Sequence, residues 1–157
     1  MTILYFLSLK WNGEIQPIGP DQKQFVTQIF TAALNMNDSP TSIEQETSNL
    51  IVEVAQLLLN AAYRGTLLAA FKSKMMMESK GLFPDGRNKL FLTLIGGGVF
   101  GNMPNWILKA FKFNEHLMRD TKLDVTLVVF NEAQLSHEMV KYFGDLVDQT
   151  GGKIIRT

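Results

Sequence analysis

The stretch that decides the fold is residues 89–111, KLFLTLIGGGVFGNMPNWILKAF. Residues 90–95 are an apolar run of β-forming side chains with the length of a buried strand. The run stops at Gly96, Gly97 and Gly98, and Pro104 follows where proline fits the first turn of a helix. This order predicts a strand, then a glycine loop, then a helix N-terminus.

A glycine loop in front of a helix N-terminus has a specific physical use. Glycine permits positive φ and lets a ligand approach the backbone without meeting a Cβ atom. The helix N-terminus presents free N–H groups and about half a positive charge to an anion. We interpret the stretch as a cradle for a phosphate or diphosphate. The alternative is a tight strand-to-helix turn that binds no ligand.

Composition limits the other classes of function. The chain has 157 residues, which predicts a single domain over residues 1–157. Fifteen basic and fifteen acidic residues cancel, so nucleic-acid binding by phosphate neutralisation is not expected. The chain has no cysteine, and His116 and His137 lack the spacing of metal ligands, so no metal site is predicted. No apolar run is long enough to cross a membrane, and we expect a soluble, cytoplasmic protein without a membrane partner.

The first third of the chain carries strand and turn signals. Residues 2–10 are predicted to be a strand, residues 11–14 (Trp-Asn-Gly-Glu) a hairpin turn, and residues 14–18 the return strand. Residues 25–34 fit helical spacing and β propensity equally well. Residues 35–45 are polar, contain Pro40 and are predicted to be a loop.

The rest of the chain alternates helices and strands. Residues 46–71 are predicted to be a long helix, with residues 72–88 as a surface connection. After the glycine loop we expect a helix over residues 104–119, a strand over 124–130, a helix over 133–149 ended by Gly151, and a strand over 153–155. This alternation predicts an α/β fold whose strands pair in parallel through right-handed crossovers.

One reading of the glycine loop is a Rossmann-type site for NAD. Gly96, Gly98 and Gly101 satisfy the G-x-G-x-x-G pattern between a strand and a helix. The acidic residue expected at the end of the next strand is replaced by Asn131. Because this acidic residue is missing, the dinucleotide-binding interpretation is the weaker one, and it is kept as an alternative.

The segment LTLIGGGVFGNMPNWILKA resembles the second ligand loop of macro domains, which bind ADP-ribose. The likeness covers roughly residues 25–145 and is greatest to macrodomain-like ADP-ribosyl hydrolases of the bacterial effector type. The resemblance implies a three-layer α/β/α domain with a mixed, largely parallel central sheet. It also favours a strand for residues 25–34, and a host cytosol as the location if the chain is a secreted effector.

The resemblance also implies roles for individual residues. The residues expected to surround the diphosphate and distal ribose are Gly96, Gly97, Gly98, Val99, Phe100, Gly101 and Asn102. Asn35 and Asn37 would belong to the first ligand loop, and Asn131 would face the ligand from the end of its strand. The ligand would be ADP-ribose or an ADP-ribosylated protein, with no other cofactor.

Hydrolysis of an ADP-ribosyl linkage would pass through an oxocarbenium-like transition state at the distal ribose, as in glycoside cleavage. A carboxylate could orient the attacking water. Asp38 is the first candidate, followed by Glu46 and Glu44, because they lie in or just after the first loop. A catalytically silent reader of ADP-ribose is the alternative to the hydrolase.

Overall fold

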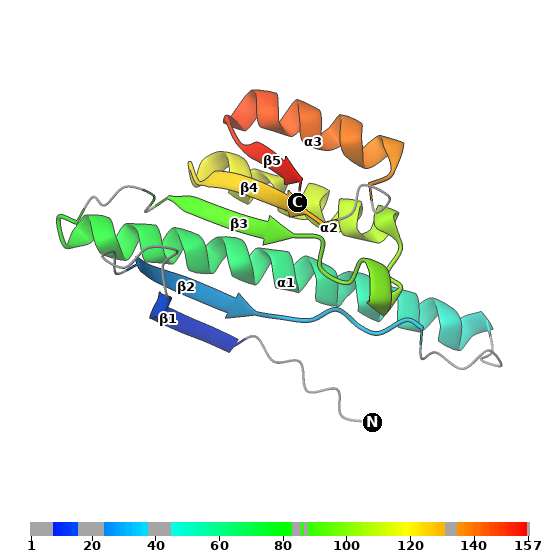
Figure 1. The fold of residues 1–157 in the computed structure, drawn as a ribbon. Helices are drawn as coiled ribbons and strands as arrows, with labels where there is room; N and C mark the ends of the chain where they lie inside the picture. The colour runs from blue at the N-terminus through cyan, green and yellow to red at the C-terminus, as the bar shows by residue number, and fades with distance from the viewer. Residues whose placement is uncertain are drawn as a thin grey trace. The chain divides into compact units, whose positions relative to one another are not determined.

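The computed structural model describes residues 8–15, 24–37, 45–82, 86, 88–130 and 135–156. The chain divides into two compact units, Met1–Ala32 and Ala33–Thr157 (Figure 1). The single domain expected over residues 1–157 stays a prediction.

The first unit contains an antiparallel pair of strands, β1 (Ser8–Ile15) and β2 (Gln24–Phe30). The strand alternative for residues 25–34 is therefore confirmed over most of its length. The turn predicted at residues 11–14 is wrong, because β1 runs through it. Residues 14–15 of the predicted return strand also belong to β1, and its residues 16–18 lie outside the described residues. The register shifts between Lys10 and Gly13, where β1 has one residue more than β2, as in a β-bulge. Pairing with β2 has overridden the local turn preference of Asn-Gly.

The second unit contains a parallel sheet of three strands. Its order is β3 (Lys89–Thr93), β4 (Asp124–Val129) and β5 (Lys153–Arg156). Leu90 lies opposite Val125, and Leu127 lies opposite Ile154. The predicted parallel pairing and the α/β class are both confirmed.

Three helices accompany this sheet: α1 (Gln45–Ser79), α2 (Pro104–Asp120) and α3 (His137–Thr150). The predicted connection at 72–88 is wrong over residues 72–79, which continue α1. Lysine and methionine are good helix formers, and no glycine or proline intervenes before Gly81. The start and the end of α2 lie within one residue of the prediction. The start predicted for the next helix, at residue 133, is wrong over residues 135–136, because Ser136 caps α3 and the helix begins at His137, while residues 133–134 lie outside the described residues. The predicted end of this helix at Gly151 is confirmed.

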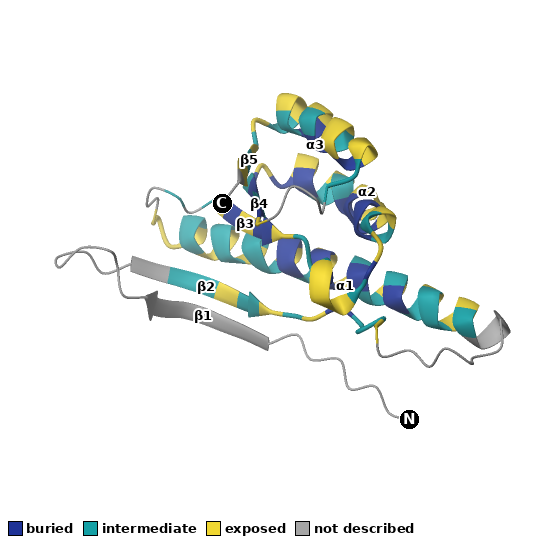
Figure 2. Ribbon diagram, turned by 45° about the vertical axis from the view of Figure 1, so that its right-hand side comes forward, coloured by how far each residue is buried: buried dark blue, intermediate teal, exposed yellow. Residues whose placement is uncertain are grey.

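One hydrophobic core joins the helices to the sheet. Tyr63 of α1 lies 4.4 Å from Phe111 of α2, which lies 4.9 Å from Phe143 of α3, between ring centroids. Leu90 and Leu92 of β3 are buried in the same core, whereas Phe91 between them is exposed (Figure 2). No helix in the described part of the chain combines the length and the apolar character that crossing a membrane requires.

Helices α1 and α2 are also tied by polar contacts along their length. Gln56 donates a hydrogen bond to the Trp106 carbonyl at 3.0 Å, and Asn114 donates to the Asn60 carbonyl at 3.0 Å. Lys74 donates to the Thr121 carbonyl at 3.0 Å, close to the end of α2. The residues pair in the same order along both helices, so α1 and α2 run in the same direction. This fixes the N-terminus of α2, where the glycine loop ends.

Candidate functional site

The predicted order of strand, glycine loop and helix N-terminus is confirmed. β3 ends at Thr93, a short 3₁₀ turn covers Gly98–Phe100, and α2 begins at Pro104. The loop therefore lies at the carboxyl edge of the parallel sheet, where open α/β sheets bind their ligands. Met103 precedes α2 and makes no side-chain capping hydrogen bond.

Tyr63 holds the point where β3 passes into the glycine loop. Its hydroxyl donates to the Thr93 carbonyl at 2.9 Å and accepts from the Ile95 N–H at 2.9 Å. Burial raises the pKa of this phenol, and the hydrogen bond from the Ile95 backbone lowers it by less. Sequence reasoning missed this role, although a single tyrosine in the apolar face of a helix is a usable signal.

A short segment far away in the sequence lies against the glycine loop. We call residues 33–37 the strap. The Met36 N–H donates to the Phe100 carbonyl at 2.8 Å, and the Asn37 side-chain amide donates to the Val99 carbonyl. In the other direction, the Asn102 side-chain amide donates to the Leu34 carbonyl at 2.8 Å. The structure thus brings the two predicted ligand loops together.

The strap explains two of the glycines in the loop. At Gly96, where φ is +80°, a Cβ atom would lie 2.5 Å from the Ala33 Cβ atom. At Gly101, where φ is +67°, it would overlap the side-chain amide of Asn37. A larger residue at either position would therefore displace the strap. These two glycines are required by a contact within the chain, whether or not a ligand binds.

The tip of the loop remains open to solvent. Gly98 is exposed, and the exposed fractions of Val99 and Phe100 are 85% and 40%. In the described part of the chain, the backbone N–H groups of Gly98 and Val99 donate to no backbone carbonyl outside the 3₁₀ turn. Neither the described strap nor residues 94–106 contain an acidic side chain. An anion that approaches these N–H groups would therefore meet no carboxylate of the described strap or of residues 94–106.

For the remaining predicted site residues, the structure describes no contact with the glycine loop. Asp38, Glu44 and Asn131 lie outside the described residues. Glu46 lies in the first turn of α1, and its side chain is also outside the description. Their predicted roles stay predictions.

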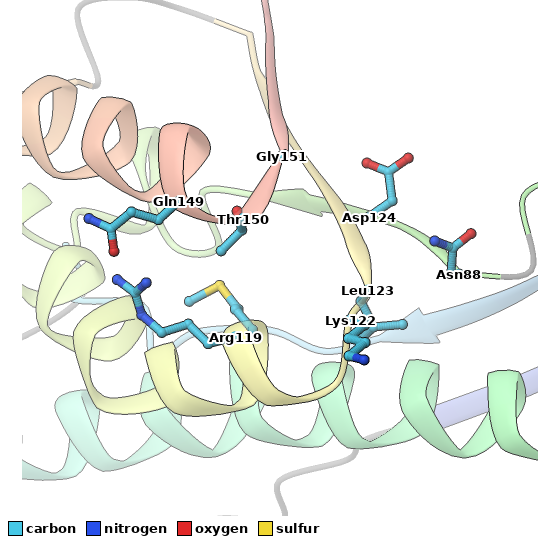
Figure 3. A pocket seen from close by; sticks show the side chains of 9 residues that line it. Asn88, Arg119, Lys122, Leu123, Asp124, Gln149, Thr150 and Gly151 are labelled. Carbon is cyan, nitrogen blue, oxygen red and sulfur yellow. The ribbon is translucent and has the colours of Figure 1, made fainter.

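A separate cavity of about 370 Å³ lies at the opposite, amino edge of the sheet (Figure 3). Its lining comes from the ends of α2 and α3 and the start of β4, with residues Asn88, Met118, Arg119, Lys122, Leu123, Asp124, Gln149, Thr150 and Gly151. Figure 3 shows Arg119 directed toward Gln149, while the carboxylate of Asp124 points away from both. Arg119 is also paired with Glu115. The charged groups of the cavity do not converge on a common point.

The strap and the glycine loop are therefore the part of the described structure that best fits a binding site. They join two segments more than 60 positions apart at the ligand-binding edge of the sheet. Comparison of this chain with protein-family models, with curated proteins and with solved structures finds no match.

Proposed function

We propose that the strap and the glycine loop bind ADP-ribose or a protein-linked ADP-ribosyl group. The observation that carries this proposal is the set of hydrogen bonds that tie residues 33–37 to residues 99–102. The resemblance to macro domains requires two ligand loops side by side. The proposal also includes the three-layer α/β/α arrangement and the mixed sheet of that family.

The chemistry of the loop suits the diphosphate of this ligand. Consecutive backbone N–H groups in a turn form a concave anion site. The positive end of α2 lies directly after the turn and adds a favourable field. In this proposal the diphosphate contacts the N–H groups of Gly98 and Val99, and Phe100 lies near the distal ribose.

Hydrolysis of the ADP-ribosyl linkage is the activity we propose for this site, with Asp38 and Glu46 as the carboxylates that would orient water. Its support is the resemblance in sequence. A reader that binds without turnover is the alternative. Release of free ADP-ribose from an ADP-ribosylated protein would identify a hydrolase, and binding without release would identify a reader.

The first experiment is a calorimetric titration of the protein with ADP-ribose, NAD and AMP. Binding of ADP-ribose in preference to NAD and AMP would support the proposal. Tighter binding of NAD would favour the Rossmann-type alternative. Absence of binding to all three would contradict a nucleotide site at this loop.

Val99 provides a sharp test of where the ligand binds. Its side chain is 85% exposed, so Val99→Glu adds a negative charge at the loop tip without disturbing the core. We expect Val99→Glu to weaken ADP-ribose binding by about tenfold, because like charges a few ångströms apart repel. Val99→Gln introduces a side chain of the same shape as glutamate but without the charge. Its affinity for ADP-ribose should stay within about twofold of the wild-type value. Equal affinities of the two variants for ADP-ribose would show that the diphosphate does not bind at this loop.

A further inference from the structure

We infer that Asn102 is a positioning residue that holds the strap on the glycine loop and so sets the geometry of the binding site. The inference rests on the proposed function for the nature of the ligand. The hold on the strap itself can be tested without a ligand.

The side chain of Asn102 is placed to tie the two segments together. Its Nδ2 donates to the Leu34 carbonyl of the strap at 2.8 Å and to the Phe100 carbonyl of the loop at 3.3 Å. Its backbone N–H donates to the Gly96 carbonyl at 3.1 Å. One residue thus contacts the start of the loop, the tip of the loop and the strap.

Burial separates this role from direct contact with a ligand. Asn102 is 4% exposed, and its side chain lies against the position where a Cβ atom of Gly96 would be. Its Oδ1 atom is buried without a hydrogen-bond partner in the described part of the chain. An unpaired buried acceptor is costly, and an apolar side chain of the same shape would avoid that cost. The benefit of an asparagine at this position must therefore come from its Nδ2 group, which donates the two hydrogen bonds to Leu34 and Phe100.

The sequence resemblance assigned Asn102 to the ligand-contacting residues, and the structure points to an indirect role instead. The strap has two other ties to the loop, from Met36 and from Asn37. Asn37 is exposed, so water competes for its hydrogen bond. The hydrogen bond from Asn102 to Leu34 is shielded from that competition and should contribute most to holding the strap.

The test replaces Asn102 by leucine, which has a similar shape but cannot donate a hydrogen bond. The control is Asn105→Leu, the same chemical change at an exposed position in the first turn of α2. Hydrogen exchange at the Met36 amide reports the strap, because this N–H is bonded to the Phe100 carbonyl. Exchange at Leu127 in the sheet reports the core, and titration with ADP-ribose reports the site.

In Asn102→Leu we expect the Met36 amide to exchange about tenfold faster and ADP-ribose affinity to fall about tenfold, since a buried hydrogen bond is lost. Exchange at Leu127 should not change, and Asn105→Leu should match the wild type in all three measurements. A general loss of stability would instead accelerate exchange at Leu127 as well.

Three results would count against parts of this account and are distinguishable. Unchanged exchange at Met36 in folded Asn102→Leu would overturn the inference. Faster exchange at Met36 with unchanged affinity would overturn the link between the strap and the ligand. Failure of the wild type to bind ADP-ribose would overturn the proposed function. Hydrogen exchange at the Met36 amide would still show whether Asn102 holds the strap on the loop. If Asn102→Leu does not fold, Asn102→Ala, which also lacks a side-chain donor, is judged by the same criteria.

Discussion

Gly101 and Gly151 have nearly the same backbone conformation, with φ of +67° and +71°, but very different surroundings. A Cβ atom at Gly151 would lie in open space, whereas at Gly101 it would overlap Asn37 of the strap. The two positions therefore separate the cost of a left-handed conformation from the cost of displacing the strap.

We expect Gly151→Ala to lower the free energy of unfolding by about 1 kcal/mol, the usual cost of positive φ for a residue with a Cβ atom. Gly101→Ala should cost roughly 1 kcal/mol more, because Asn37 must also give up its place and its hydrogen bond to Val99. Urea unfolding of both variants measures the difference. Equal losses would show that the strap contact contributes no stability.

At the scale of elements, α2 and α3 are joined by a small polar network on their surface. Glu115 of α2 accepts hydrogen bonds from Arg119, four residues along the same helix, and from Tyr142 of α3 at 2.9 Å. Burial raises the pKa of the Glu115 carboxyl, but together the hydrogen bonds and the nearby positive charges of Arg119 and Lys112 outweigh it, so the net shift is downward. The network thus favours the ionised carboxylate in the folded state.

Because the pKa of Glu115 is lowered in the folded state, the free energy of unfolding depends on pH. A carboxyl whose pKa is lower in the folded state stabilises the fold above its unfolded pKa, and this stabilisation is lost as pH falls through the folded pKa. Glu115→Gln should therefore cost on the order of 0.5 kcal/mol at pH 7, the range for partly exposed ion pairs. At pH 3 the difference from the wild type should shrink. Denaturant unfolding at both pH values checks this, and a constant difference would argue against the assigned network.

At the scale of the whole molecule, the buried core residues that the structure describes all belong to the second unit. They run from Ala33 to Leu146 and come from the strap, α1, α2, α3 and the parallel sheet. The first unit contributes one described antiparallel pair of strands, and such a pair alone is marginally stable in water. The second unit should hold most of the stability of the chain.

We therefore expect a fragment of residues 33–157 to fold cooperatively, with a thermal midpoint within about 10 °C of the full chain. Circular dichroism during heating measures the midpoint, and the near-ultraviolet spectrum checks the packing of Phe111 and its aromatic neighbours. A fragment that does not unfold cooperatively would favour the single domain predicted over residues 1–157.

Local sequence signals predicted much of the second unit. The apolar runs at β3 and β4, the proline at the start of α2 and the glycine after α3 are each read over a few residues. Alternation of these elements was sufficient to predict parallel pairing. The turn placed at residues 11–14 failed because the local preference of Asn-Gly competes with a strand pairing that involves residues 24–30.

The sequence by itself determined the α/β class, the order of the elements and the position of the glycine loop, because periodicity, capping and turn residues act over short distances. Only the tertiary structure decided what the glycines contact. Gly96 and Gly101 face a strap more than 60 residues earlier in the chain, Tyr63 fixes the end of β3 from α1, and Asn102 is buried between strap and loop. These roles depend on which distant segments meet in the fold, and no local pattern specifies that.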